Sequence, residues 1–97
     1  MRGGHAMRRA FERYGVNLGP ADIRVLADKI IVGMCEQFER ENRRIRKVFV
    51  EANGVELPVV FSDQTGRIIT VLPPDAAEVQ RAYAKREARR SIQEAAE

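Results

Sequence analysis

Hydrophobic residues recur at helical spacing in two segments near the start of the chain. In the segment from His5 to Tyr14, one face is formed by Met7, Ala10, Phe11 and Tyr14, and Gly15 then ends the helix. In the next segment, Pro20 suits the first helical position, and an apolar stripe is formed by Ile23, Leu26, Ala27, Ile30, Ile31 and Met34. We expect this second helix to end near Gly33 and both helices to cover a sheet.

Strand patterns fill the middle of the chain. Residues 45–52 are rich in β-branched and aromatic residues, and Asn53-Gly54 is a strong signal for a two-residue hairpin turn. The alternating residues Val55, Leu57, Val59 and Phe61 are expected to face the helices. Pro58 removes a ladder donor, so we expect it where its neighbour is missing or bulged.

A second turn over residues 63–66 leads into residues 67–72. These are apolar on both faces apart from Thr70, which predicts a strand in the middle of the sheet. Residues 34–41 either extend the second helix or form an edge strand that pairs through a turn at Asn42-Arg43. The sequence leaves both alternatives open.

A helix is expected at the end of the chain. Pro73-Pro74 ends the last strand, and Asp75 with Glu78 three residues later has the pattern of a capping box. The predicted fold is therefore α+β, with two N-terminal helices packed on a three- or four-stranded antiparallel sheet and a C-terminal helix. We assign residues 1–74 to the core and residues 75–97 to an accessory helix.

Size and composition narrow the functional classes. The 97 residues suffice for one domain, with 44% hydrophobic residues. One cysteine and one histidine exclude an intrachain disulfide and argue against a structural zinc site, and no phosphate-binding loop or pair of catalytic carboxylates occurs. No apolar run approaches the roughly 20 residues of a membrane span, and we expect no secretory signal. We expect a cytoplasmic protein without metal, cofactor or membrane contact.

The positive charge is clustered, although the net charge is only +3. Residues 1–14 hold Arg2, Arg8, Arg9 and Arg13 against Glu12 alone. Residues 40–47 hold Arg40, Arg43, Arg44, Arg46 and Lys47 against Glu41 alone. Clusters of this kind are typical of polyanion binders, and equally of a merely solvated surface.

Two segments resemble the small bacterial and phage toxins of the RelE-like group, in the wider barnase, colicin and RelE nuclease class. The first is the opening His5, Arg9 and Arg13-Tyr14-Gly15. The second runs from Leu57-Pro58-Val59-Val60-Phe61-Ser62-Asp63 to Gly66-Arg67-Ile68-Ile69-Thr70-Val71-Leu72-Pro73. Each piece is short, and together they span residues 5–73.

This resemblance implies an endoribonuclease that cuts RNA by 2′-hydroxyl attack without a metal ion. His5 would be the general acid or base, Arg9 and Arg13 would steady the scissile phosphate, and Thr70 would position it. The chain lacks the histidine or tyrosine that the better-studied toxins carry after the last strand. The second acid–base group is then either missing or supplied by Tyr14, Lys47 or Tyr83.

Other functions fit the same residues. A non-catalytic protein of bacterial or phage origin could dock nucleic acid or a nucleoprotein complex through its basic residues, which are Arg8, Arg43, Arg44, Arg46, Lys47 and Arg67. An assembly module could instead bind an antitoxin-like partner, or a second copy, through residues 79–92. Thr70 is also explained as a β-branched strand residue, and His5 as a mobile residue near a chain end.

Overall fold

A central hairpin organises the computed structural model, which describes the backbone of residues 2–96 and the side chains of residues 4–93. Strands β2 (Ile45–Ala52) and β3 (Val55–Ser62) pair antiparallel from end to end. Between them, Asn53 and Gly54 have φ angles of 52° and 78°, as a two-residue turn of this hand requires. The predicted hairpin is confirmed.

With the two outer strands, the order of strands in the sheet is β1-β2-β3-β4, and all neighbours are antiparallel. Strand β1 (Glu36–Arg40) pairs with β2, so residues 36–40 form the edge strand rather than an extension of the helix. Strand β4 (Arg67–Val71) lies at the opposite edge, and its predicted central position is wrong. Its apolar character has another cause, because the two N-terminal helices both pack against this strand.

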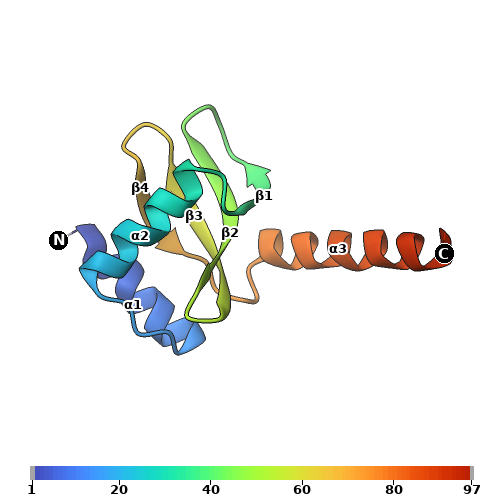
Figure 1. Ribbon diagram of the computed structural model, residues 1–97, viewed down its shortest axis with the longest axis horizontal. Coiled ribbons are helices and arrows are strands. Elements are labelled where there is room, and N and C mark those ends of the chain that lie inside the picture. Colours follow the sequence, from blue (N-terminus) through green and yellow to red (C-terminus); the bar gives the residue numbers. More distant parts are fainter. Residues whose placement is uncertain (1, 97) are drawn as a thin grey trace.

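Two helices, α1 (Arg2–Tyr14) and α2 (Pro20–Ile31), lie on one face of the sheet (Figure 1). Their buried residues meet the inward side chains of β2 and β3 in one core, whose β3 members are Leu57, Val59 and Phe61. The predicted packing of two N-terminal helices on an antiparallel sheet is confirmed, and the fold is α+β. Among the described residues, no helix has the length and apolarity needed to span a membrane.

The buried face of α1 differs from the predicted one. Ala6 and Ala10 are fully buried, whereas Phe11 is 61% exposed. The alanines let the helix backbone lie close to β4, which turns Phe11 outward and brings the polar side of α1 to the strand. The side chain of Arg2, which belongs to the predicted basic segment, lies outside the described ones.

The apolar stripe of α2 is shorter than predicted. Leu26, Ala27 and Ile30 are buried, but Ile31 and Met34 are 59% and 64% exposed. The helix ends at Ile31, and Gly33 then turns the chain with a φ of 86°, so the later positions leave the helical face.

Helix α3 (Ala77–Ala96) packs its first half on the other face of the sheet, and its second half extends away from the core (Figure 1). Val79 and Ala82 are buried against Phe49. The helix begins one residue later than the capping pattern predicts, and the carboxylate of Glu78 binds a lysine of β2 instead. The first half of α3, which follows residue 74, therefore belongs to the core of the domain.

Candidate nucleic-acid interface

The N-terminal helix brings the only histidine of the chain to the edge strand β4. His5 Nε2 lies 3.0 Å from Thr70 Oγ1, a contact between residues 65 apart in sequence. The imidazole is exposed, and the hydroxyl is half-buried. Thr70 therefore has a hydrogen-bond partner, which fixes one ring nitrogen of His5 and leaves the ring accessible.

The two arginines that share this side of α1 each have a protein acceptor. Arg13 Nη1 donates to the backbone carbonyl of Val71 at 2.6 Å, one residue beyond Thr70. Arg9 Nη1 donates to Glu12 Oε1 at 2.9 Å. His5, Arg9 and Arg13 follow one another at four-residue spacing on α1, and the first and last of them contact neighbouring residues of β4, Thr70 and Val71.

Tyr14 follows Arg13 on α1 and donates from its hydroxyl to the carbonyl of Leu72 at 2.7 Å. Burial raises the pKa of the phenol to about 12, with a further contribution from Tyr83. The hydroxyl is thus fixed and holds its proton at neutral pH. This makes Tyr14 a poor second acid–base group.

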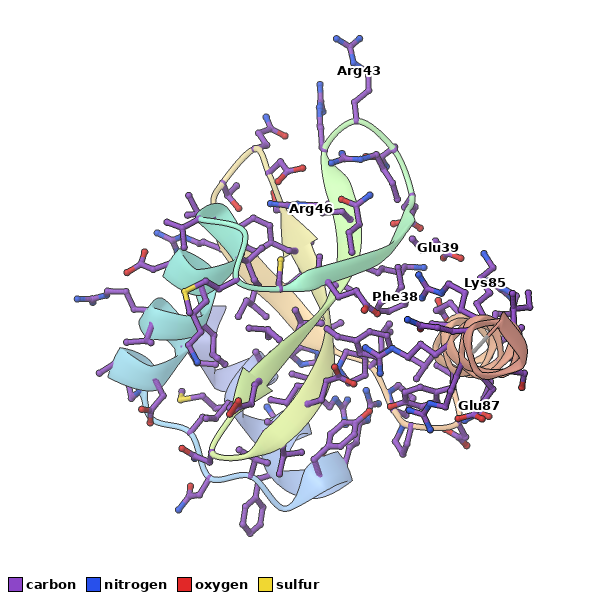
Figure 2. All side chains as sticks on the ribbon, turned by 45° about the vertical axis from the view of Figure 1, so that its right-hand side comes forward. Phe38, Glu39, Arg43, Arg46, Lys85 and Glu87 are labelled. Carbon is purple, nitrogen blue, oxygen red and sulfur yellow. The ribbon has the colours of Figure 1, made fainter. Side chains whose placement is uncertain are left out.

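The loop between β1 and β2 presents exposed arginines in an ordered frame. Asn42 Oδ1 accepts the backbone N–H groups of Arg44 and Ile45, at 2.8 and 2.9 Å. Arg40 adds hydrogen bonds to the carbonyls of Asn42 and Arg43. Arg43 points away from the body of the molecule at the loop tip (Figure 2). The loop therefore carries two outward guanidinium groups, those of Arg43 and Arg44, on a defined turn.

Arg46 is engaged at the base of this loop. Its Nε donates to Asp63 Oδ1 at 2.9 Å, and its guanidinium lies 5.4 Å from the centre of the Phe61 ring. Asp63 also accepts from Arg40 at 3.2 Å. One carboxylate thus compensates two arginines of the predicted basic segment.

Lys47 lies under α3 rather than on the outer surface. Its Nζ donates to Glu39 Oε2 at 2.9 Å and to Glu78 Oε2 at 2.8 Å, and the residue is 9% exposed. Hydrogen bonds to the two carboxylates raise the pKa of Lys47, and those bonds lower the pKa values of Glu39 and Glu78. Lys47 therefore joins two strands and a helix, and it is not available on the outer surface.

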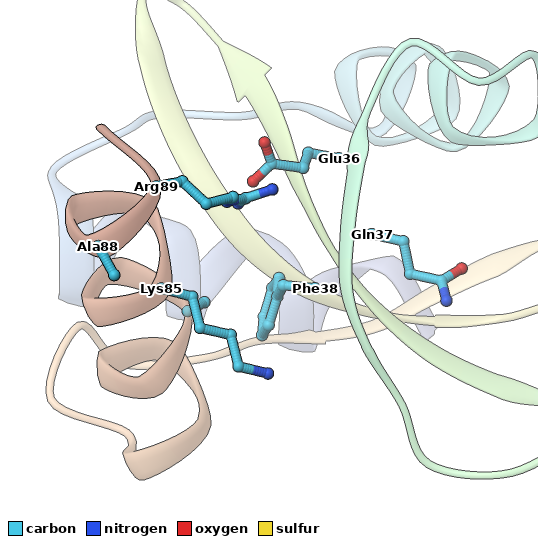
Figure 3. Close-up of a pocket in the computed structure, with 7 residues that line it drawn as sticks. Glu36, Gln37, Phe38, Lys85, Ala88 and Arg89 are labelled. Atoms are coloured by element: carbon cyan, nitrogen blue, oxygen red, sulfur yellow. The ribbon is translucent and has the colours of Figure 1, made fainter. Parts of the chain in front are cut away.

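A network of ion pairs between α3 and the sheet was not anticipated from the sequence. Arg86 bridges Glu36 and Glu56 and stacks 4.3 Å from the centre of the Phe49 ring, while Arg81 binds Glu39. Beyond these anchors, a cavity of about 480 Å³ opens between β1 and α3 (Figure 3). It is lined by Glu36, Gln37, Phe38, Ala82, Lys85, Ala88 and Arg89. Tyr83, the remaining candidate for acid–base chemistry, stacks on Phe49.

A larger groove, of about 770 Å³, lies between α2 and the start of β4. Arg67, predicted as a nucleic-acid contact, lines it from the strand, and Arg24 lines it from the helix. Sequence reasoning missed Arg24, because it sits singly on the polar side of an amphipathic helix. Only the pairing of α2 with β4 places the two guanidinium groups on one groove.

The remaining candidate residues lie apart from these features. Arg8 is exposed on α1. Burial raises the pKa of the Cys35 thiol, which donates to the carbonyl of Ile30 at 3.9 Å, consistent with a packing residue. Within the described residues, no group of three or more histidine, cysteine, aspartate or glutamate side chains is arranged to hold a metal ion.

Comparison of the chain with protein-family models, with curated proteins and with solved structures found no match.

Proposed function

We propose that this domain binds RNA and cleaves it without a metal ion, using His5 as its acid–base group. The observation that carries the proposal is the contact of 3.0 Å between His5 Nε2 and Thr70 Oγ1. It joins an imidazole, the side chain used most often in general acid–base catalysis, to a strand hydroxyl, beside Arg9 and Arg13. Residues from both ends of the fold are needed to build this cluster.

In this proposal the two ring nitrogens have different roles. Among the described residues, Nε2 has Thr70 as its partner and Nδ1 has no hydrogen bond. When Nε2–H donates to Thr70 Oγ1, the Nδ1 lone pair can take the proton of a ribose 2′-hydroxyl. The 2′-oxygen then forms a bond to phosphorus, and the bond from phosphorus to the 5′-oxygen breaks. The products are a 2′,3′-cyclic phosphate and a 5′-hydroxyl.

Proton return completes the reaction. Tyr14, Lys47 and Tyr83 are held in structural contacts, so they are poor sources of the proton for the leaving 5′-oxygen. The protonated His5 must then donate it, directly or through a water molecule. Arg9 is the guanidinium best placed to offset charge on the phosphate, since its partner Glu12 is exposed and this surface ion pair is easily exchanged.

A second candidate function, non-catalytic docking of nucleic acid, is favoured by the engagement of Arg13. Its guanidinium serves the carbonyl of Val71, which is a structural use. The exposed Arg43 and Arg44 on the ordered β1–β2 loop suit contact with a phosphate backbone without any catalytic group.

The test is cleavage and binding of a structured RNA in EDTA by the intact protein and three variants. We expect His5→Ala to abolish cleavage, and Thr70→Val to slow it while preserving strand shape. Both variants should retain RNA affinity. Neutralising both loop residues, as Arg43→Gln with Arg44→Gln, should weaken binding and reduce the salt slope by roughly 1.4 on single-stranded RNA.

Three results decide between the candidates. Binding without cleavage by the folded wild-type protein would contradict the nuclease and support docking. Cleavage that survives His5→Ala would contradict the assignment of the acid–base group. Absence of RNA binding at low salt would contradict both functions.

A further inference from the structure

We propose that the groove between α2 and β4 is a nucleotide-binding subsite that holds one base and phosphate of the RNA substrate. This inference rests on the proposed function and adds a site that lies outside the His5–Thr70 cluster. The groove has a volume of about 770 Å³. That volume falls within the range of cavities that take small organic ligands.

The groove combines an apolar floor with positive charge on both sides. Its apolar lining residues are Pro20, Ile23, Ala27, Ile68 and Ile69, contributed by α2 and β4. Arg24 reaches it from the helix and Arg67 from the strand, and both are exposed. In the part of the chain that the structure describes, neither guanidinium group has a hydrogen bond or ion pair with another residue. Two unpaired guanidinium groups beside an apolar surface suit a ligand with both a phosphate and a flat ring.

The polar groups of the groove suit the rest of a nucleotide. Thr65 supplies a hydroxyl from the β3–β4 turn, and Asp28 supplies a carboxylate from α2. A carboxylate accepts hydrogen bonds from ribose hydroxyls, and it would repel a second phosphate. Gly66 has a φ of 70°, and the nearest heavy atom to a Cβ built there is Ile31 Cδ1 at 3.9 Å. The backbone of the turn is therefore open to a bound ligand.

Strand β4 connects this groove to the proposed cleavage site. Ile69 lines the groove, and Thr70, the next residue, contacts His5. The register of β4 against β3 shifts at this point, and Ile69 is left 43% exposed. The groove and the His5–Thr70 contact are therefore formed by consecutive residues of one strand. A strand of RNA that crosses the edge of β4 would contact both.

The experiment follows binding of adenosine monophosphate, inorganic phosphate and adenosine to the full chain, by two-dimensional amide NMR. We expect the monophosphate to bind more tightly than either part, with shifts centred on Gly66, Ile68 and Ile69. Arg24→Gln and Arg67→Gln should each weaken it by about threefold to tenfold. Ile69→Glu places a negative charge on the floor and should abolish binding without unfolding, because the side chain is exposed. The matched control Arg90→Gln, on the far part of α3, should bind as the wild type.

The outcomes separate this proposal from the proposed function. Loss of RNA cleavage with retained monophosphate binding in His5→Ala would support a distinct subsite. Absence of shifts at the groove would overturn the subsite even if cleavage persists. Binding of the monophosphate by both arginine variants as tightly as by the wild type would do the same. Equal affinity for phosphate and monophosphate would also overturn it, since the base would then contribute nothing. Failure of a short single-stranded oligoribonucleotide to displace the monophosphate would assign the groove to free nucleotides and contradict the RNA subsite.

Discussion

The hydroxyl of Tyr14 takes the place of the backbone N–H that Pro58 lacks. Pro58 accepts the N–H of Leu72 at 2.8 Å in the ladder between β3 and β4, and an ordinary residue would return a bond to the carbonyl of Leu72. Proline cannot donate, and Tyr14 donates to that carbonyl instead, at 2.7 Å. A helix side chain thereby completes the end of a β-ladder and ties α1 to the sheet.

Removal of this hydroxyl should destabilise the fold. Tyr14→Phe leaves the half-buried carbonyl of Leu72 without its donor, and we expect a loss of about 1–2 kcal/mol in the free energy of unfolding. Urea denaturation measures it. Tyr83→Phe is the matched control, because in the described part of the chain that hydroxyl makes no hydrogen bond. Equal stability of the two variants would contradict a structural role for the Tyr14 bond.

The same tyrosine gives a dependence on alkaline pH. Its pKa is raised from 10.0 to about 12, mainly by burial, so folding favours the protonated phenol. This contribution to stability is complete below pH 10 and is lost as the pH rises toward 12. Ultraviolet titration of tyrosinate should show one phenol titrating near 12 in the wild type and none there in Tyr14→Phe. Two normally titrating tyrosines in the folded wild type would contradict the expectation.

Local patterns in the sequence were sufficient to predict most of the helices and strands. The arrangement of the candidate site depends on long-range contacts. The Asn53-Gly54 turn and the alternation in β3 are local signals, and both predictions are confirmed. The edge position of β4 could not be read locally, because a strand covered by α1 has the same apolar pattern as a central one. Residues 36–40 were ambiguous for a similar reason, since their polar pattern does not exclude a helix.

The candidate site likewise combines residues that were identified from the sequence with residues that only the fold reveals. His5 and Thr70 were both singled out from the sequence, and the fold brings them into contact. Arg24 and the burial of Lys47 were missed. Spacing along the chain does not reveal that α2 lies across a groove from Arg67, or that Glu39 and Glu78 converge on one lysine from a strand and a helix.

Loss of Lys47 should be costly at neutral pH and much less so in acid. Lys47→Met leaves two neighbouring carboxylates without their shared cation, and we expect a loss of about 1–3 kcal/mol at pH 7. The pKa values of Glu39 and Glu78 are depressed, so their contribution is present above their ordinary pKa of 4.5 and is lost as the pH falls. Urea denaturation at pH 7 and at lower pH measures the difference. An equal loss for Arg44→Met, at the exposed loop, would contradict the buried role.

Two glycines should respond oppositely to alanine. Neither Gly54 nor Gly4 has an atom within 4 Å of a built Cβ, so space does not distinguish them. Gly54 has a φ of 78°, and Gly54→Ala should lose about 1 kcal/mol of stability. Gly4 lies within α1, and Gly4→Ala should gain about 0.5–1 kcal/mol. Thermal unfolding of the two variants measures both changes, and a loss of stability in each would contradict the argument from backbone conformation.

Release of the arginines at the base of the β1–β2 loop should strengthen RNA binding. Asp63 accepts from Arg40 at 3.2 Å and from Arg46 at 2.9 Å, so Asp63→Asn removes the carboxylate that offsets the charge of two guanidinium groups beside the exposed loop. We expect higher affinity and a steeper dependence on salt, because more phosphates are neutralised on binding. Asp75→Asn is the matched control, since it removes the same charge and, among the described residues, Asp75 has no ion pair. If both variants raise affinity equally, net charge rather than the loop governs binding, and the proposed role of Arg43 and Arg44 in a defined interface is contradicted.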